Sequence, residues 1–241
     1  MSDGSMLAGR GAFPGRLVMG YRAFLEGRFH SEQGRFQRLA EAGQTPKIML
    51  IGCCDSRVSP EVIFDAGPGE IFVLRNVAAL VPPYRPNDDY HGTSAALEFA
   101  VMGLRVEQIV VMGHALCGGV RAYAENAADP YARPLSAGDF IGQWMKLIAP
   151  AAQRLSAPIG APGAAYLEAL ALEAIRESLA NLRSFPWVTT LEERGRLTLH
   201  GAYFGVADGR LLALDEATGR FAGVAEDAWT KALSGTPALS G

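Results

Sequence analysis

Short apolar runs alternate along the chain with longer segments of helical spacing. Three runs, at 48–52, 71–74 and 108–112, have the length of strands. The first is apolar throughout and the third is apolar after Gln108, which is typical of parallel strands covered by helices on both faces. Between and after these runs, apolar residues recur with the helical period of about 3.6 residues. The predicted helices span residues 92–104, 118–125, 136–148 and 164–182.

The helix predicted at 92–104 has the sequence GTSAALEFAVMGL. Thr93 or Ser94 is placed to cap its N-terminus, because a hydroxyl oxygen there can accept from a free N–H group of the first turn. Leu97 and Leu104 share one helical face. We therefore expect both to point toward the core.

The N-terminal part of the chain predicts a helical arm. Residues 1–13 are rich in Gly and Arg and are interpreted as a loose extension, and Pro14 has the position of a helix-starting proline. An apolar stripe follows, made of Leu17, Tyr21, Phe24, Leu25 and Phe29. A second short helix around Phe36 is expected to end at Gly43. The stripe is larger than an appendage needs to cover its own core, which predicts contact with a second subunit.

Toward the C-terminus the pattern changes from helical to alternating. The segment RLTLHGAYFGVADGRLLALD holds two strand-like runs separated by Asp208 and Gly209, a strong hairpin signal. The predicted fold is therefore α/β: a short, mostly parallel β-sheet with an antiparallel edge strand, flanked by helices and preceded by the arm. The Ala/Pro/Gly-rich stretch 149–163 is interpreted as a surface loop rather than a linker, so residues 1–241 are expected to form a single domain.

Composition and charge indicate whether the chain binds nucleic acid or membranes and in which compartment it is expected. The formal net charge of −3 gives no broad electrostatic footprint for nucleic acid. No segment approaches the roughly 20 apolar residues of a membrane span. The N-terminal sequence has no apolar stretch of signal-peptide length, and an odd count of 3 cysteines argues against a disulfide framework. We expect a cytoplasmic protein that binds neither nucleic acid nor membranes.

Candidate metal ligands lie at the ends of the first and third predicted strands. Cys53 ends the first, and the third runs into GHALCGG, which presents His114 and Cys117. Sites in open α/β sheets form at the carboxyl ends of strands, so these residues would meet if the two strands are neighbours. Three protein ligands leave the fourth position of a tetrahedral zinc for water or substrate, which is the catalytic pattern. His91 and His200 are further candidates, but neither sits in a spaced pair, and we interpret both as structural.

A carboxylate and a guanidinium accompany the first of these ligands. In GCCDSR, Asp55 follows Cys53 by two residues, and Arg57 follows two residues later. One interpretation is an ordinary surface ion pair, worth only about 0–1 kcal/mol. In the other, Asp55 approaches the open metal position and Arg57 holds it off by charge pairing; the accompanying H-x-x-C favours this interpretation. Cys54 is interpreted as a core thiol that points away from Cys53.

These residues give the chain a resemblance to the beta-class carbonic anhydrases over nearly its whole length. The paired signatures C-x-D-S-R and H-x-x-C carry it, and the segments DFIGQWMKLI and LHGAYFGVADGRL support it. The resemblance implies a carbonic anhydrase (carbonate dehydratase), a zinc lyase whose Zn2+ is bound by Cys53, His114 and Cys117. It also implies that Asp55 and Arg57 form a catalytic dyad. The arm would wrap a partner subunit in a homodimer, or in a tetramer made of two dimers.

The same resemblance implies the reaction: reversible hydration of carbon dioxide to bicarbonate and a proton, by a zinc-bound hydroxide that the dyad orients. Substrate contacts are expected from Gln44, Phe72, Val77, Phe99 and Gly118. Gln44 would donate from across the dimer interface, and the backbone N–H of Gly118 would donate to the developing bicarbonate oxygens. Phe72 and Val77 would form an apolar wall. Phe99 stands where many members have a tyrosine.

Other departures from the family pattern bear on regulation. Ala79 replaces a frequent asparagine. Some members have a second bicarbonate pocket made by an arginine, here Arg75, with a tryptophan and a tyrosine, which are Leu50 and Phe204 in this chain. Since two donors are missing, we expect a constitutively open site with the dyad intact. Two alternatives stay open: an enzyme that hydrolyses carbon disulfide or carbonyl sulfide on the same scaffold, and a zinc-stabilised binding module without turnover.

Overall fold

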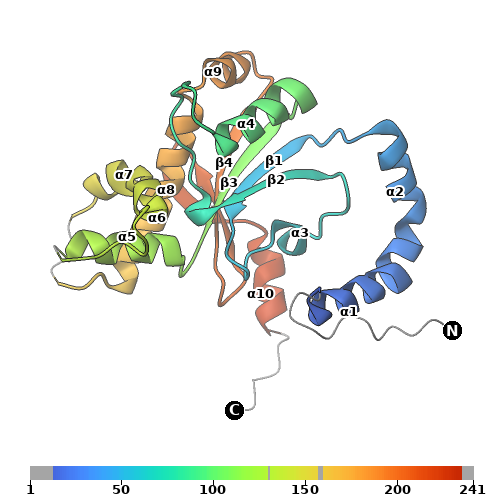
Figure 1. Ribbon diagram of the computed structural model, residues 1–241. Coiled ribbons are helices and arrows are strands. Elements are labelled where there is room, and N and C mark those ends of the chain that lie inside the picture. Colours follow the sequence, from blue (N-terminus) through green and yellow to red (C-terminus); the bar gives the residue numbers. More distant parts are fainter. Residues whose placement is uncertain (1–12, 130, 157–159, 235–241) are drawn as a thin grey trace, which may run out of the picture. The chain divides into compact units, whose positions relative to one another are not determined.

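The computed structural model describes residues 13–129, 131–156 and 160–234 (Figure 1). They separate into a helical arm that ends at Gln44 and a sheet-containing unit that begins at Thr45. Residues 1–12 of the predicted loose extension lie outside the described residues. A single domain over the whole chain stays a prediction.

The arm is one continuous helical rod rather than two helices. Its parts are α1 (Gly15–Phe24), a π-helical segment (Leu25–Phe29) and α2 (His30–Ala42). The predicted break before the second helix is wrong, because no residue there stops a helix until Gly43, which has a φ of 77°. Phe24, Phe29 and Phe36 form an aromatic cluster with ring centroids 5.3 to 5.8 Å apart. Tyr21 stays 60% exposed, so part of the apolar stripe is uncovered.

The second unit is built on one six-stranded sheet in the order β2-β1-β3-β4-β5-β6. Its strands are β1 (Ile48–Cys53), β2 (Ile71–Asn76), β3 (Gln108–His114), β4 (Thr198–Phe204), β5 (Leu211–Asp215) and β6 (Arg220–Gly223). Strands β1 to β4 pair in parallel, whereas β5 and β6 are antiparallel. The predicted α/β sheet with an antiparallel edge is confirmed. Strand β6 extends that edge beyond the predicted hairpin.

Helices flank this sheet (Figure 1). They are α3 (Pro60–Ile63), α4 (Gly92–Glu98), α5 (Gly118–Ala128), α6 (Phe140–Met145), α7 (Ala149–Gln153), α8 (Ala164–Leu182), α9 (Pro186–Glu193) and α10 (Glu226–Ser234). A π-helical segment (Phe99–Leu104) continues α4, and 3-10 turns occupy Val77–Ala79 and Lys146–Ile148. No helix in the described ranges is long and apolar enough to cross a membrane.

Two local predictions about these helices are wrong. Helix α7 lies where the sequence predicts a surface loop; it packs against α8, and Ala151 is fully buried. His91, not Thr93 or Ser94, precedes α4, and no side chain caps that helix. Thr93 is instead buried, and its hydroxyl accepts a hydrogen bond from the side chain of Asn76. The hydroxyl of Thr93 thus bonds to Asn76 rather than capping the N-terminus of α4.

The arrangement of the parallel strands positions the candidate site. Strands β1 and β3 are direct neighbours, paired from Ile48 with Gln108 to Gly52 with Met112. Both are almost entirely buried, as their uninterrupted apolar runs predict. Because they run in the same direction, their carboxyl ends leave the sheet at the same edge.

Candidate metal centre

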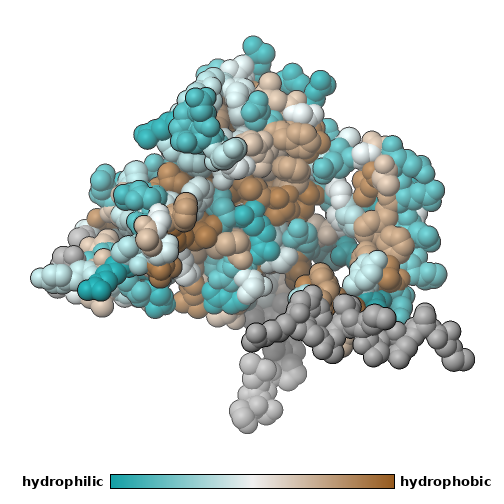
Figure 2. Space-filling view, viewed as in Figure 1, coloured by the Kyte–Doolittle hydropathy of each residue, from teal (hydrophilic) through white to brown (hydrophobic). Residues whose placement is uncertain are grey.

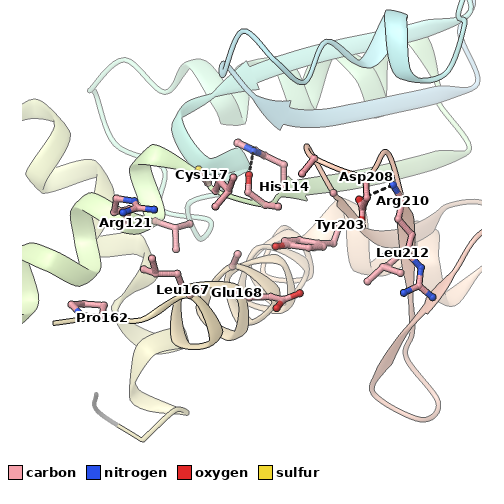
Figure 3. A pocket seen from close by; sticks show the side chains of 17 residues that line it. His114, Cys117, Arg121, Pro162, Leu167, Glu168, Tyr203, Asp208, Arg210 and Leu212 are labelled. Atoms are coloured by element: carbon pink, nitrogen blue, oxygen red, sulfur yellow. Dashed lines mark hydrogen bonds between the residues drawn. The ribbon is translucent and has the colours of Figure 1, made fainter. Parts of the chain in front are cut away.

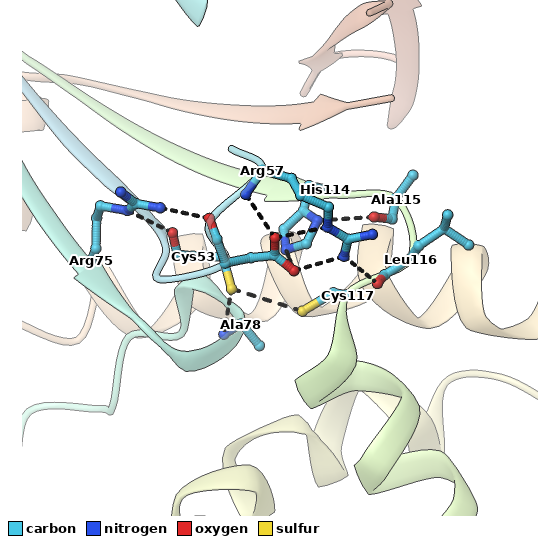
Figure 4. Close-up of polar contacts among 9 residues, drawn as sticks. Cys53, Arg57, Arg75, Ala78, His114, Ala115, Leu116 and Cys117 are labelled. Carbon is cyan, nitrogen blue, oxygen red and sulfur yellow. Dashed lines mark hydrogen bonds and ion pairs between the residues drawn. The ribbon is translucent and has the colours of Figure 1, made fainter. Parts of the chain in front are cut away.

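Three buried side chains converge where β1 and β3 end (Figure 4). Cys53 is the last residue of β1, His114 is the last residue of β3, and Cys117 directly precedes α5. Their ligand atoms all lie within 4.8 Å of one another, and the two sulfurs are 4.0 Å apart. Tetrahedral zinc with Zn–S bonds of about 2.3 Å places two sulfurs about 3.8 Å apart. The structure therefore brings the three predicted ligands together at a spacing that fits zinc.

The imidazole of His114 is fixed in the form that binds a metal. Its Nδ1 lies 2.9 Å from the carbonyl oxygen of Ala115, which can only accept, so Nδ1 carries the proton. The lone pair is therefore on Nε2, which is buried and has no hydrogen-bond partner among the described residues. A buried lone pair without a partner is unfavourable, and a metal ion supplies one.

The two thiols lie in contact, and each changes the pKa of the other. The hydrogen bond from Cys117 lowers the pKa of Cys53 to about 4, and the backbone N–H of Ala78, 3.3 Å from its Sγ, also favours the thiolate. The same bond to Cys53, together with burial, raises the pKa of Cys117. The contact between the two sulfurs therefore shifts the two pKa values in opposite directions. Cys53 and Cys117 would both bind a divalent cation as thiolates, and binding would release their protons.

Asp55 and Arg57 form a tightly bonded pair beside the triad (Figure 4). The Arg57 backbone N–H and Nε donate to Oδ1 of Asp55 at 3.0 and 2.9 Å, and Nη2 donates to Oδ2 at 2.7 Å. These bonds hold the pKa of the Asp55 carboxyl well below its usual range. Oδ2 lies 4.0 Å from Nε2 of His114, so an ionised acceptor stands next to the position of the metal.

The other predicted residues lie at the following places in the fold. Phe72 and Phe99 lie with ring centroids 5.9 Å apart, and Phe99 is 53% exposed. Gly118 is the first residue of α5, and Val77 follows β2 directly. Gln44 is the last residue of the arm, and its place at the site stays a prediction.

Three residues outside the triad were interpreted from sequence as structural. Cys54 is exposed, so its interpretation as a core thiol is wrong: Cys53 points into the core, and the next residue of an extended chain faces the opposite way. His200 pairs with the side chain of Gln108, and His91 pairs with that of Asn87. Both histidines therefore have polar partners away from the triad.

The sequence reasoning missed two features of the centre. Arg75 donates to the carbonyl oxygens of Cys53 and Asp55, at 2.8 and 2.7 Å, and so braces the chain between ligand and dyad. A cavity of about 430 Å³ adjoins His114 and Cys117, and the hydroxyl of the buried Tyr203 points into it (Figure 3). Burial, with nearby carboxylates, raises the pKa of Tyr203 to about 12. The position of Arg75 next to the last residue of β2 was a sequence signal that its side chain lies at this edge of the sheet.

Comparison with known proteins identifies the family. Residues 48–211 match the family model described as carbonic anhydrase. A carbonic anhydrase of Pseudomonas aeruginosa is 38% identical over 221 residues, which cover 92% of this chain and 96% of that relative. The chain belongs to the carbonic anhydrase family. Its activity is accordingly that of a carbonate dehydratase.

Solved structures place this carbonic anhydrase in the beta class. The beta-carbonic anhydrase CcaA superposes with a TM-score of 0.73 at 30% identity, covering 87% of this chain and 91% of that one. A tetrameric beta-carbonic anhydrase from the ascomycete Sordaria macrospora gives a TM-score of 0.69 at 28% identity, covering 87% and 98%. The Cys-His-Cys triad is the ligand set typical of the beta-class zinc site.

Proposed function

We propose that this carbonic anhydrase hydrates carbon dioxide reversibly at a zinc ion held by Cys53, His114 and Cys117, with Asp55 and Arg57 as its catalytic dyad. The observation that carries the proposal is Nε2 of His114, which has no hydrogen-bond partner among the described residues and lies with two contacting thiols beside an ionised carboxylate. When bound, zinc supplies a hydroxide nucleophile at neutral pH by lowering the pKa of water.

Asp55 orients that nucleophile. Its Oδ2 is 4.0 Å from Nε2 of His114, so it would accept a hydrogen bond from a nucleophile that the zinc supplies at the triad. This interaction turns a lone pair of the nucleophile toward the carbon of the substrate. Arg57 keeps Asp55 ionised and, through three hydrogen bonds, prevents the carboxylate from becoming a fourth ligand.

The proposed substrate contacts suit a small apolar gas that becomes an anion. Phe72, Val77 and Phe99 supply apolar surface for carbon dioxide. The backbone N–H of Gly118 lies in the first turn of α5, where N–H groups have no partner within the helix, and it donates to the developing bicarbonate. Gln44 of a second subunit adds an amide donor. The dyad thus acts on the nucleophile, whereas these donors act on the oxygens of the substrate.

We propose a homodimer, or a tetramer made of two such dimers. The arm leaves Leu17 and Tyr21 at 55% and 60% exposure. On the sheet-containing unit, Phe99 and Met102 are 53% and 56% exposed, and Figure 2 shows hydrophobic side chains gathered over α4 and the segment that follows it. Apolar surface of this kind favours burial between subunits. A cytoplasmic location, with neither nucleic acid nor membrane as a partner, stays a prediction.

Zinc content and carbon dioxide hydration measured on the same purified sample test the proposal. We expect one zinc per chain and rapid hydration. Cys117→Ser should lose both together, because two remaining ligands hold the ion far more weakly. Stoichiometric zinc in that variant would contradict the ligand assignment. Turnover of carbon disulfide without hydration of carbon dioxide would contradict the reaction.

A further inference from the structure

The loop after β2 crosses Cys53 with an unusual backbone. Ala78 and Ala79 have φ values of 65° and 56°, in the left-handed region that residues with a Cβ disfavour. Asparagine tolerates this region better than alanine does, and alanine at position 79 replaces the residue that the family resemblance leads one to expect there. Two consecutive alanines in this conformation persist only where surrounding contacts hold them.

One peptide unit of this loop bridges an indole and a sulfur. The carbonyl of Val77 accepts a hydrogen bond from Nε1 of Trp144 at 2.9 Å, and the N–H of Ala78 donates to Sγ of Cys53 at 3.3 Å. These two groups belong to the same trans peptide, so they point in opposite directions. The hydrogen bond that fixes the carbonyl of Val77 therefore also fixes the direction of the N–H of Ala78. Each of these two hydrogen bonds polarises the peptide and so strengthens the other.

The alternative orientation of this peptide removes the donor from the sulfur. Rotating it by half a turn returns φ of Ala78 to the negative region and relieves the strain, but it turns a carbonyl oxygen toward the thiolate. Other contacts hold only the later part of the loop. Asn76 bonds to both the N–H and the C=O of Leu80, and Ser178 accepts from the N–H of Val81. Within the part of the chain described, the bond from the indole is the side-chain hydrogen bond that holds the carbonyl of Val77, so besides the bond to Cys53 itself it opposes this rotation.

We propose that Trp144 is a positioning residue of the metal centre, which keeps the N–H of Ala78 on the Cys53 thiolate. The proposal rests on the zinc site proposed above. An N–H donor draws negative charge from sulfur, so it limits the charge that two thiolates pass to the metal and preserves its strength as a Lewis acid. Trp144 itself touches neither the substrate nor the reacting atoms.

Replacing Trp144 by 3-benzothienylalanine tests this, because sulfur takes the place of the indole N–H while the shape is kept. In the full-length protein loaded with Co2+, we expect the thiolate-to-cobalt charge-transfer band to move to longer wavelength, since the sulfur lone pairs lose a stabilising donor. In the zinc enzyme, kcat should fall about tenfold, the lower end of what loss of such an outer contact costs. Trp144→Phe should change both readouts in the same direction.

The matched control is the same analogue at Trp187. That indole lies tilted against the ring of Phe185, with centroids 5.3 Å apart, and makes no hydrogen bond with any residue that the structure describes. We expect wild-type spectrum and kcat there. An unchanged band with the analogue at Trp144, or an equal shift with the analogue at Trp187, would overturn the inference. A wild-type protein that binds no zinc would refute the proposed site and, with it, this role.

Discussion

Replacing Asp55 by asparagine changes one acceptor into a donor without changing the shape of the side chain. Oδ1 accepts two N–H groups of Arg57, and Oδ2 accepts one. The amide oxygen of Asp55→Asn should take the Oδ1 position, because two of the three bonds are kept there. Its NH2 group then takes the Oδ2 position, 4.0 Å from Nε2 of His114. The proposed nucleophile loses its acceptor and meets a donor.

The size of the effect follows from that reversal. A positioned group that handles the proton of a nucleophile contributes about 10²- to 10⁴-fold to the rate. At about 1.4 kcal/mol per decade, this is about 3–5 kcal/mol of activation free energy. The triad is untouched, and the new amide oxygen still accepts from Arg57. We therefore expect kcat to fall at least about 100-fold while zinc stays at one per chain.

Stopped-flow hydration of carbon dioxide with a pH indicator measures this loss, with zinc determined on the same sample. Asp65→Asn is the matched control: it makes the same chemical change on an exposed carboxylate that forms no ion pair with the described residues. We expect the control to keep wild-type kcat. Retention of more than about one third of kcat by zinc-loaded Asp55→Asn, against the 10²-fold loss expected of such a group, would refute the orienting role.

Three further predictions concern assembly, regulation and stability. Deleting residues 1–30 should dissociate the dimer and lower kcat through loss of Gln44 from the site; a truncated protein that stays an active dimer in sizing experiments contradicts this. Bicarbonate should not inhibit cooperatively, because Leu50 and Phe204 lack the N–H and O–H of a second anion pocket; a sigmoidal inhibition curve would contradict it. Ser178→Ala should lower the free energy of unfolding, measured by urea titration, by about 1–3 kcal/mol. The buried hydroxyl of Ser178 accepts from the N–H of Val81 and donates to the carbonyl of Ala79 in the loop after β2, and the variant loses both bonds. A change below about 0.5 kcal/mol would show that water replaces the hydroxyl.

The parallel strands and the metal ligands were predictable from sequence for a physical reason. A nearly continuous apolar run of strand length is typical of a parallel strand that helices cover on both faces of the sheet. The runs 48–52 and 108–112 therefore predict β1 and β3. Ligands at their ends then share one edge of the sheet. The pairing of β1 with β3 was not readable, because neighbouring positions in a sheet depend on how the crossovers pack.

The features that escaped prediction depend on tertiary contacts. The residue type of Ala78 gives no sequence signal for a left-handed backbone, since alanine disfavours that conformation. The contacts of the loop stabilise it. Helix α7 forms because Ala151 gains burial against α8, although its Ala/Pro-rich sequence is also that of a loop. The arm continues through Leu25–Phe29 because no glycine or proline signal there is strong enough to end it.

All three candidate ligands and the dyad lie between Cys53 and Cys117, whereas β4 and α8 come later in the chain. During synthesis the ribosome releases the N-terminal part first, so the ligand set is complete before the elements that close the core have emerged. Zinc that binds then would hold β1 and β3 together ahead of their cover. In such an order the zinc ion would first stabilise a partly folded nascent chain and later serve as the catalytic cofactor of the folded enzyme.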